Sequence, residues 1–513
     1  MATGSLPDRD VEKSGGPMSE ELEGSHLKDT VTATVLASSA PERKLVWKQD
    51  KRIVPLAAGI YFLCYLDRSN IGNARTLNSS TKNDMQTETG TNADSFNVAL
   101  FLHGFYGGGG RCRIICHISL LLLTTFKGYF LFEVPSNILL KKLRPSRWLA
   151  FLMLSWGAIT IGLGGVHNFA AMTGVRFLLG AVEAGLFPGL IYYLTFWYKT
   201  DERSVRVAFI LASATLAGAF GGAIAYGVGH MNQTSGLSAW RWLFILEGIP
   251  SCLSAILVFF FLPDYPERAS WLSESEKDLA AQRLYHEGAK GSASGLKWED
   301  VKATLTDWRL YGHYAIYFAV SLPFSSLSLF SPSIVAGLGY HDLEAQLFTV
   351  PPWAVAYVVQ VLVAWSADHF NARAYHCAGA AVVGAAGFLA SALLPPDSYS
   401  SRYGCLIVGT AGAFASIPPM LGWLTSNMFS TASIGLAIAL NVSIGAGLGQ
   451  MPGVWIYKAD EASRGYPTGH GVNCAMLFFV AIGALCLRYF YGRKNKALLN
   501  EAAEGTTPRL YKL

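Results

Sequence analysis

Apolar runs long enough to cross a bilayer recur along almost the whole chain. A spanning helix needs about 20 predominantly apolar residues, and the hydropathy pattern predicts twelve such segments. The segments lie at about 53–74, 95–140, 147–166, 170–198, 205–229, 241–262, 310–335, 347–367, 374–395, 402–424, 432–453 and 471–491. We therefore expect an all-α membrane protein with twelve transmembrane helices in two six-helix halves.

The stretches outside these segments predict how the chain is divided. Residues 1–45 are rich in Gly, Ser, Pro and charge and contain no apolar core of a signal peptide, so we expect a disordered cytoplasmic N-terminus. The first six-helix half is predicted at 46–262 and the second at 308–492. A polar cytoplasmic linker, 263–307, joins them, and 493–513 form a cytoplasmic tail.

The linker contains a helix-start signal. Ser273 and Glu276 have the spacing of a capping box, in which each side chain bonds to the other residue's backbone N–H. This spacing predicts a helix over 274–286.

Lysine and arginine are unevenly distributed between the two sets of loops. Most of them fall in one set, namely Lys48, Lys51, Arg52, Lys141, Lys142, Arg144, Arg147, Lys199, Arg203, Arg206, Arg373, Arg493, Lys494 and Lys496. The positive-inside rule assigns this set to the cytoplasm, so both termini are expected there. The sequons at Asn78 and Asn232 fall in the opposite loops, which predicts N-glycosylation of both asparagines.

Composition narrows the possible function classes. The chain is 51% hydrophobic and 15% charged, whereas soluble domains are about 25% charged. The net charge of +5 is spread over short loops, so no nucleic-acid partner is expected. The eight cysteines are scattered and show no disulfide or zinc framework. We expect the lipid bilayer as the environment, and neither a metal nor a cofactor.

Two charged residues stand inside the fourth apolar segment. Arg176 and Glu183 are the only charged residues between positions 168 and 198. A charged group near the bilayer centre costs ~2.5–3.5 kcal/mol on insertion scales. Because they are seven residues apart, they share one helix face at about 10 Å separation. Substrate binding or coupling is one interpretation, and a structural ion pair or gate latch is the other.

The second apolar segment contains an anomalous insertion, 102–127. It includes four successive glycines at 107–110 and the polar run RCRIICH at 111–117. A helix over 95–140 would have 46 residues, too long for about 30 Å of hydrocarbon, and irregular polar backbone facing lipid is disfavoured. We interpret the insertion as a retained intron or a gene-model error. The alternative is a real insertion that forms a re-entrant or luminal loop.

Several motifs resemble one family of transporters. They read YLDRSNIGNAR at 65–75, RFLLGAVEAGLFPG at 176–189 and WRWLFILEGIP at 240–250, together with 132–148 and 262–277. The combination resembles the fungal allantoate permease family, a branch of the anion:cation symporters in the major facilitator superfamily. The resemblance implies a major facilitator fold and uptake of a small carboxylate such as allantoate, nicotinate, pantothenate or biotin, usually with protons. Nicotinate permeases are the members that it resembles most.

Related animal anion transporters add a possible binding site. They share Arg-x-Asn in the first segment, which matches Arg68 and Asn70, and an arginine seven residues before a glutamate in the fourth, which matches Arg176 and Glu183. Arginine is a forked donor that suits a carboxylate. We therefore expect Arg68 and Arg176 to bind the anion, with Asn70 nearby. For Arg68 the alternative is a local pair with Asp67 near the outer surface.

Proton coupling requires an acid that binds and releases a proton inside the membrane. Burial raises the pKa of a carboxylate, and a nearby arginine lowers it. We expect Glu183 to carry the proton: when protonated it would release Arg176 to the substrate, and when ionised it would compete with the substrate. Glu133 is a second candidate, and its alternative role is packing near the cytoplasmic gate against Lys141 or Arg144.

Polar residues of the second half are candidates to orient a substrate. Each has an interhelical hydrogen bond as its alternative role, and the set is Asn441, Gln450, Gln360, Tyr314 and Tyr317. The loop after the eighth segment keeps Asp368 and Arg373 of the superfamily's gate motif but has His369 where arginine is usual. The loop after the second segment lacks the motif's aspartate. We predict that Asp368 and Arg373 form a partial gate.

These features favour a secondary active transporter of a small organic anion, importing with protons across the plasma membrane and functional as a monomer. The alternative is a carrier that exports a secondary metabolite from a biosynthetic gene cluster. A polytopic membrane enzyme would need clustered catalytic residues, and the histidines at 103, 117, 167 and 230 form no such cluster. A transporter-like sensor would have a long cytoplasmic tail, whereas the tail predicted here is only 493–513. A transporter driven by ATP would need a Walker motif, and the sequence contains none.

Overall fold

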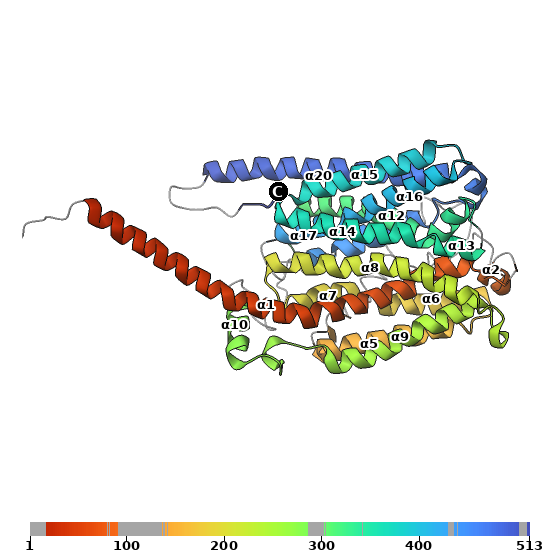
Figure 1. The fold of residues 1–513 in the computed structure, drawn as a ribbon, viewed down its shortest axis with the longest axis horizontal. Helices are drawn as coiled ribbons and strands as arrows, with labels where there is room; N and C mark the ends of the chain where they lie inside the picture. Colours follow the sequence, from red (N-terminus) through yellow and green to blue (C-terminus); the bar gives the residue numbers. More distant parts are fainter. Residues whose placement is uncertain are drawn as a thin grey trace, which may run out of the picture. The chain divides into compact units, whose positions relative to one another are not determined.

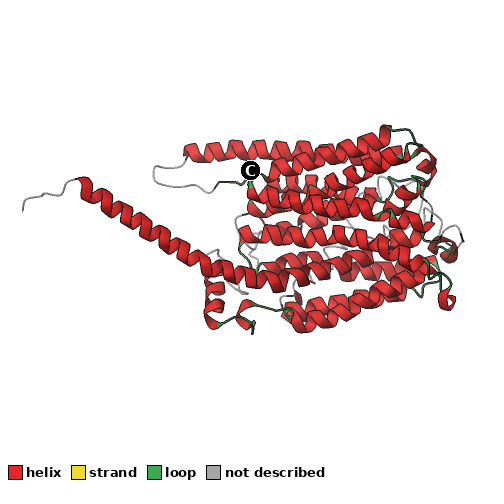
Figure 2. Ribbon diagram, viewed as in Figure 1, coloured by secondary structure: helices red, strands yellow, loops and turns green. Residues whose placement is uncertain are grey.

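The computed structural model describes residues 17–78, 81, 83–90, 136, 139–140, 142–285, 302, 304–340, 342–428, 436–438, 440–501 and 510–513. The chain divides into two compact units, Met1–Lys51 and Arg52–Leu513. The second unit holds all the predicted apolar segments. Its described elements are helices of α, 3-10 or π type, with no strand in this part of the chain (Figure 2).

A first set of spanning helices, which we call the N-terminal group, extends from Arg52 to Phe261. It comprises the end of α1 (Pro17–Thr76), α5 (Pro145–Leu163), α6 (Phe169–Glu183), α7 (Leu186–Leu194), α8 (Thr200–Gly229) and α9 (Ala239–Phe261) (Figure 1). Helices α5 and α9 lie side by side and approach closely at glycines. A Cβ atom on Gly157 would lie 3.0 Å from the carbonyl oxygen of Gly248. Small residues allow this kind of close approach between membrane helices.

A second set, which we call the C-terminal group, extends from Trp308 to Glu501. It comprises α12 (Trp308–Ala336), α13 (Asp342–Leu347), α14 (Val350–His369), α15 (Arg373–Leu393), α16 (Tyr399–Ala415), α17 (Ile417–Ser426), the π-helical turn η4 (Asn441–Gly447), α19 (Leu448–Gly453) and α20 (Pro467–Glu501). Here α15 and α16 meet at glycines, because a Cβ atom on Gly384 would lie 2.9 Å from the backbone nitrogen of Ala413. Short helices in the connections are α2 (Met85–Thr89), η2 (Thr234–Gly236), η3 (Pro266–Arg268), α10 (Glu274–Tyr285) and η5 (Ala459–Arg464).

Nine helical stretches in the described residues are long and apolar enough to cross a membrane. They correspond to predicted segments three to ten and twelve. Segment one is helical within α1, segment eleven is described in part, and segment two lies outside the described residues apart from 136, 139 and 140. Large apolar side chains are exposed along α9, at Leu253, Ile256, Leu257, Phe260 and Phe261, as lipid-facing positions require. The all-helical prediction is confirmed, and a count of twelve is consistent with this arrangement.

Two polar stretches of the sequence contain helices. For 1–45 the sequence predicts disorder, and the structure describes Pro17–Thr76 as helix α1. Proline fits a first helical turn, where its missing N–H is not needed, and the glutamates and leucines that follow are good helix formers. The capping box of α10 is confirmed, because Glu276 N donates to Ser273 Oγ at 3.3 Å and Ser273 N donates to Glu276 Oε2 at 2.9 Å.

The two groups contact each other through α8, which packs against both α14 and α17. Side-chain hydrogen bonds cross the boundary from Thr215 Oγ1 to Gln360 Oε1 at 2.6 Å, from Gln346 Nε2 to Thr76 Oγ1 at 2.8 Å, and between the hydroxyls of Tyr65 and Ser328. Helix α1 also approaches α12 closely at Gly72, where a Cβ atom would lie 2.6 Å from the carbonyl oxygen of Leu329. Movement of one group against the other must break or exchange such contacts.

Candidate functional site

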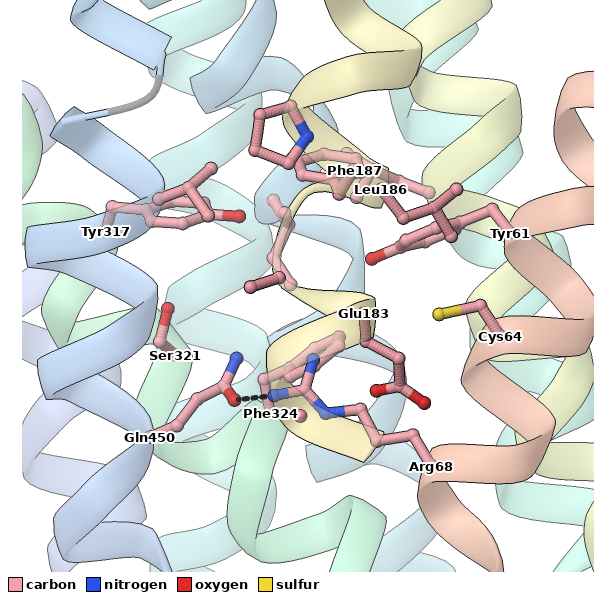
Figure 3. Close-up of a pocket in the computed structure, with 16 residues that line it drawn as sticks. Tyr61, Cys64, Arg68, Glu183, Leu186, Phe187, Tyr317, Ser321, Phe324 and Gln450 are labelled. Atoms are coloured by element: carbon pink, nitrogen blue, oxygen red, sulfur yellow. Dashed lines mark hydrogen bonds between the residues drawn. The ribbon is translucent and has the colours of Figure 1, made fainter. Parts of the chain in front are cut away.

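A cavity of about 70 Å³ lies between the N-terminal and C-terminal groups (Figure 3). Helices α1, α6, α7 and α8 form one side of its wall, and α12, α17, η4 and α19 form the other. The lining residues are Tyr61, Cys64, Arg68, Gly180, Glu183, Ala184, Leu186, Phe187, Pro188, Leu211, Tyr317, Ser321, Phe324, Ile417, Val442 and Gln450. A ligand bound here would touch both groups.

Arg68 enters the cavity from α1 and reaches across it. Its Nη2 donates a hydrogen bond to Gln450 Oε1 of α19 at 3.0 Å (Figure 3). The preceding residue points elsewhere, because Asp67 Oδ2 accepts a hydrogen bond from Ser251 Oγ of α9 at 2.6 Å. Successive helical residues are rotated by about 100°, which separates these neighbours. Asp67 is fully buried and bonds to α9. It therefore does not form the pair with Arg68 near the outer surface that the sequence left as the alternative.

Glu183 lies at the end of α6, where the fourth segment is interrupted. Helix α7 starts at Leu186, with Gly185 as its N-cap. Pro188 has no N–H to donate and its ring crowds the preceding turn, which favours a break here. Gly185 is required because a Cβ atom would collide with Ser136. The break leaves the Glu183 carboxylate in the cavity with Arg68 (Figure 3).

Aromatic side chains form much of the remaining wall. Tyr61 of α1 packs on Phe187 of α7, with ring centroids 5.1 Å apart. Tyr317 and Phe324 come from α12, on the opposite side. Figure 3 shows the hydroxyl ends of Tyr61 and Tyr317 directed into the space between them. The cavity thus combines ring surfaces with one arginine, one glutamate and the amide of Gln450.

Arg176 occupies a different place from the one that the shared helix face predicts. It does not line the cavity with Glu183; it lies in a small enclosed space with Trp240 and Phe244, and its guanidinium is 5.3 Å from the Phe244 ring centroid. Seven residues advance a helix by about 10 Å, so two residues on one face need not reach the same cavity. Arg176 is fully buried, and its three side-chain nitrogens have no hydrogen-bond partner among the described residues.

Two buried acids accompany Arg176 behind the cavity. Asp67 and Glu247 interact electrostatically with each other, and Asp67 and Glu183 with Arg176. Glu247 is 2% exposed, and neither of its carboxylate oxygens has a hydrogen-bond partner in the described part of the chain. Glu247 is not among the residues that the sequence predicts for the site. An acid inside the apolar run 241–262 is the same signal that singled out Glu183.

The other predicted polar residues divide between the cavity and the helix contacts. Tyr317 and Gln450 line the cavity, whereas Gln360 makes the interhelical bond to Thr215. Asn70 and Asn441 are fully buried outside the cavity lining, although Asn441 is next to Val442, which lines it. Tyr314 is also buried outside the lining. Glu133 lies outside the described residues, as does the insertion at 102–127.

Asp368 and Arg373 form an ion pair at one end of the C-terminal group. Arg373 Nε donates to Asp368 Oδ1 at 2.7 Å, and its Nη1 donates to the Gly422 carbonyl oxygen at 3.2 Å. Arg373 also bonds to the Ser426 hydroxyl. The pair therefore joins α14 and α15 to the last turn of α17.

The two sequon asparagines lie in connections between helices. Asn78 has a left-handed backbone, with φ of 56°, and its Nδ2 donates to the Gly229 carbonyl oxygen at 3.4 Å. Asn232 Oδ1 accepts from the backbone nitrogen of Ala239 at 3.2 Å, the first residue of α9. Both asparagines are half-buried.

Comparison with known proteins gives one consistent result. Residues 58–454 match the family model of the Major Facilitator Superfamily. MFS transporter prlL of Fungal sp. (strain NRRL 50135) is 61% identical over 493 residues, which are 96% of this chain and 95% of that protein. A relative from Agrobacterium vitis that is named as a tartrate transporter is 32% identical over 406 residues, 79% of this chain and 82% of that protein.

The fold has solved counterparts with little sequence identity. The xylose transporter XylE from E. coli, in a partially occluded inward-open conformation, superposes with a TM-score of 0.58 at 13% identity. The match covers 86% of this chain and 98% of that one. It shows the fold alone.

Proposed function

The chain belongs to the Major Facilitator Superfamily, and is thus a multi-pass membrane transporter rather than an enzyme; on that premise we propose that it is a secondary active transporter of a small organic anion. The anionic group is a carboxylate, and uptake is coupled to protons. One observation carries the proposal: Arg68 projects into the cavity between the two helix groups. In this superfamily the substrate site lies where the halves meet, near the bilayer midplane.

The charge of the cavity favours a monocarboxylate. Arg68 is the only cationic side chain in the described part of the wall. A guanidinium binds one carboxylate with two parallel hydrogen bonds, and this interaction is stronger in a site of low dielectric constant than in water. A relative named for tartrate transport supports an organic anion as the substrate class. The motifs at 65–75 and 176–189 support the allantoate permease family, with nicotinate or pantothenate as candidate substrates.

Glu183 is the proton carrier in this proposal. Since it shares the cavity with Arg68, an ionised Glu183 competes with the substrate carboxylate for the arginine. Protonation removes that competition and gives the site a net positive charge. Substrate and proton therefore bind together, which couples uptake to the proton gradient. Arg176 balances the charge of the acids behind the cavity, and Glu133 remains a candidate second proton site.

The remaining assignments complete the proposal. Asn70 and Asn441 contact the substrate in a rearranged state of the two groups, and the Asp368–Arg373 pair closes one end of the pathway. The distribution of lysine and arginine supports cytoplasmic termini. That orientation exposes Asn78 and Asn232 for glycosylation at the outer side of the plasma membrane, where a monomer carries out transport.

Uptake into proteoliposomes tests the proposal. The purified protein is reconstituted with an inward proton gradient, and accumulation of labelled nicotinate, pantothenate, allantoate and tartrate is followed with and without an uncoupler. We expect uncoupler-sensitive accumulation of at least one carboxylate, lost by more than about 100-fold in Arg68→Ala. Arg493→Ala, on an exposed face of α20, is the matched control and should transport normally.

Other outcomes separate the alternatives. Binding of a carboxylate that is unaffected by Arg68→Ala would refute the assignment of the site. Loss of preloaded substrate against its gradient, with no accumulation in the uptake direction, would instead support the carrier that exports a secondary metabolite.

A further inference from the structure

We propose that Gln450 is a built-in competitor for the substrate, which occupies the carboxylate position on Arg68 and sets the affinity of the site. The inference rests on the proposed function, because it assumes that Arg68 binds the anion. It assigns to Gln450 a specific role: a positioning residue that acts on the substrate through Arg68.

The hydrogen-bond chemistry fixes which end of Gln450 faces Arg68. Arginine has only donors, so the amide oxygen must be the atom that accepts from Nη2, at 3.0 Å. An amide oxygen is an uncharged acceptor in the direction from which a carboxylate oxygen would approach. The bond to the amide is charge-assisted on the arginine side only, whereas a carboxylate is charged as well and can accept two parallel N–H···O bonds from the guanidinium. A carboxylate can therefore displace the amide, but its net affinity is reduced by the bond that it replaces.

The surrounding backbone holds Gln450 in this position. Its neighbour Gly449 lies directly against α12, where a Cβ atom would meet Phe318, and a Cβ atom on Gly453 would lie 2.8 Å from the Leu322 carbonyl oxygen. Helix α19 is thus fixed on α12 on both sides of Gln450. The amide competes effectively because it needs little ordering to reach Arg68.

The Arg68–Gln450 bond also connects the two helix groups. Arg68 belongs to α1 and Gln450 to α19, so displacement of the amide by substrate removes one contact between the groups. Binding is in this way linked to the movement that alternating access requires. A ligand shifts such an equilibrium only when it interacts differently with the two states, and exchange at Arg68 provides that difference.

Gln360 supplies a matched control. It is also a buried glutamine of the C-terminal group that bonds across the boundary, accepting from Thr215 Oγ1 at 2.6 Å. Unlike Gln450, it does not line the cavity. Gln450→Met and Gln360→Met each remove one bond between the groups and keep side-chain volume, but only the first removes a competitor from Arg68.

The experiment measures Kd on purified protein for benzoate, nicotinate, pantothenate and tartrate, with folding checked by size-exclusion chromatography. For those carboxylates whose binding is lost in Arg68→Ala, we expect Gln450→Met to lower Kd by about tenfold or more, the worth of one net hydrogen bond to a charged group. Gln360→Met should leave Kd within about twofold. Gln450→Glu should raise Kd by more than about tenfold at neutral pH, with recovery at acidic pH as the new carboxylate is protonated.

The outcomes distinguish this inference from the proposed function. If no carboxylate shows binding that depends on Arg68, the proposed function fails, and the inference fails with it. If such binding exists but Gln450→Met leaves Kd unchanged or raises it, only the competitor role is refuted. Equal decreases in Kd for Gln450→Met and Gln360→Met would also refute it, because they would reflect looser contact between the groups.

Discussion

The two helix groups differ in the polar side chains that they bury and in the hydrogen bonds that these side chains make. The N-terminal group buries Asp67, Arg176, Glu183 and Glu247, each at most 9% exposed. Arg176 and Glu247 have no hydrogen-bond partner for their charged atoms among the described residues.

The C-terminal group contains a bonded network around Asn473 of α20 instead. Its Nδ2 donates to Ser326 Oγ at 3.1 Å and to the Tyr457 hydroxyl at 3.0 Å, and that hydroxyl hydrogen bonds with His470 Nδ1 at 3.2 Å. This group also has buried polar atoms without a hydrogen-bond partner among the described residues, among them the Tyr314 and Ser391 hydroxyls and the amide of Asn441. Asn441 lies in the π-helical turn beside the cavity. Such turns occur frequently at functional sites.

The difference separates two roles. Burying a charge without hydrogen bonds destabilises a protein unless opposite charges compensate it, and violations of this kind are expected at functional sites. Under the proposed function, the N-terminal group holds the charges that change partners during transport. The C-terminal group provides a stable frame that presents Gln450, Tyr317 and Phe324 to them. Substitutions should affect the two groups in correspondingly different ways.

The largest effect is expected at Arg176. Arg176→Met removes the cation that balances Asp67 and Glu183, and leaving buried charges uncompensated costs about 3–5 kcal/mol. We expect a large loss of melting temperature in detergent, measured by fluorescence-detected size exclusion. The double variant Arg176→Met/Glu183→Gln removes one of the acids and should recover part of the loss. Equal melting temperatures for the single and double variants would show that charge balance is not what Arg176 provides.

The sequence predicted the helices much better than it predicted the geometry of the charges. Apolar runs specify spanning helices because lipid requires all backbone groups to be satisfied within the segment. The capping box at Ser273 and Glu276 was likewise predictable, because it is a local interaction. The spacing of seven residues predicted that Arg176 and Glu183 share one helix face, and both are buried on α6. It could not show that only Glu183, at the break before α7, reaches the cavity, because that depends on how the helices pack together.

Contacts between distant segments were the least predictable. The bonds from Arg68 to Gln450 and from Ser251 to Asp67 join residues 382 and 184 positions apart. Sequence reasoning considered only the adjacent pair of Asp67 and Arg68. Which partner each one takes is decided by how α1 packs between α9 and the C-terminal group.

A second prediction concerns Glu183 and separates binding from coupling. Glu183→Gln keeps the size of the side chain and cannot release a proton. In wild type, uptake should fall as the outside pH rises, because the ionised carboxylate competes for Arg68. In the variant we expect uptake to become independent of pH and accumulation to fall about tenfold, to simple equilibration. Proteoliposome uptake at several pH values measures both, and uptake that stays accumulative and pH-dependent would refute the assignment.

A third prediction tests the frame. Asn473→Leu removes the centre of the network and leaves the Tyr457 and Ser326 hydroxyls with fewer partners, which should cost about 1–2 kcal/mol of stability. The Kd for a carboxylate should stay within about twofold, because none of these residues lines the cavity. Ser331→Ala is the control, since in the described part of the chain its hydroxyl bonds within α12 alone, to the Leu327 carbonyl oxygen at 2.6 Å. A large change in Kd for Asn473→Leu at unchanged stability would contradict the claim that this network stabilises the C-terminal group without affecting binding in the cavity.

The smallest effect is expected where residues 510–513 pack on the end of the C-terminal group. Lys512 N donates to Asn427 Oδ1 at 2.8 Å, and Lys512 O accepts from Trp423 Nε1 at 2.9 Å and from Asn427 Nδ2 at 3.2 Å. The adjacent residue is held in the same way, since Tyr511 N donates to Asn495 Oδ1 and Tyr511 O accepts from Asn495 Nδ2, both at 2.8 Å. The segment thus joins α17 to α20 through main-chain atoms.

This geometry makes a backbone substitution informative. Lys512→Pro removes the N–H that donates to Asn427 and restricts the backbone of Tyr511. Lys512→Ala keeps this N–H, leaves the backbone of Tyr511 unrestricted and removes only an exposed side chain. We expect the proline variant to lose about 1 kcal/mol of stability and the alanine variant to melt like wild type, with Kd unchanged in both. Arg373 also holds α17 through hydrogen bonds to Gly422 and Ser426, so loss of the Lys512 bonds alone should not move this helix. A proline variant with an altered Kd would show that packing at this end of α17 affects binding in the cavity.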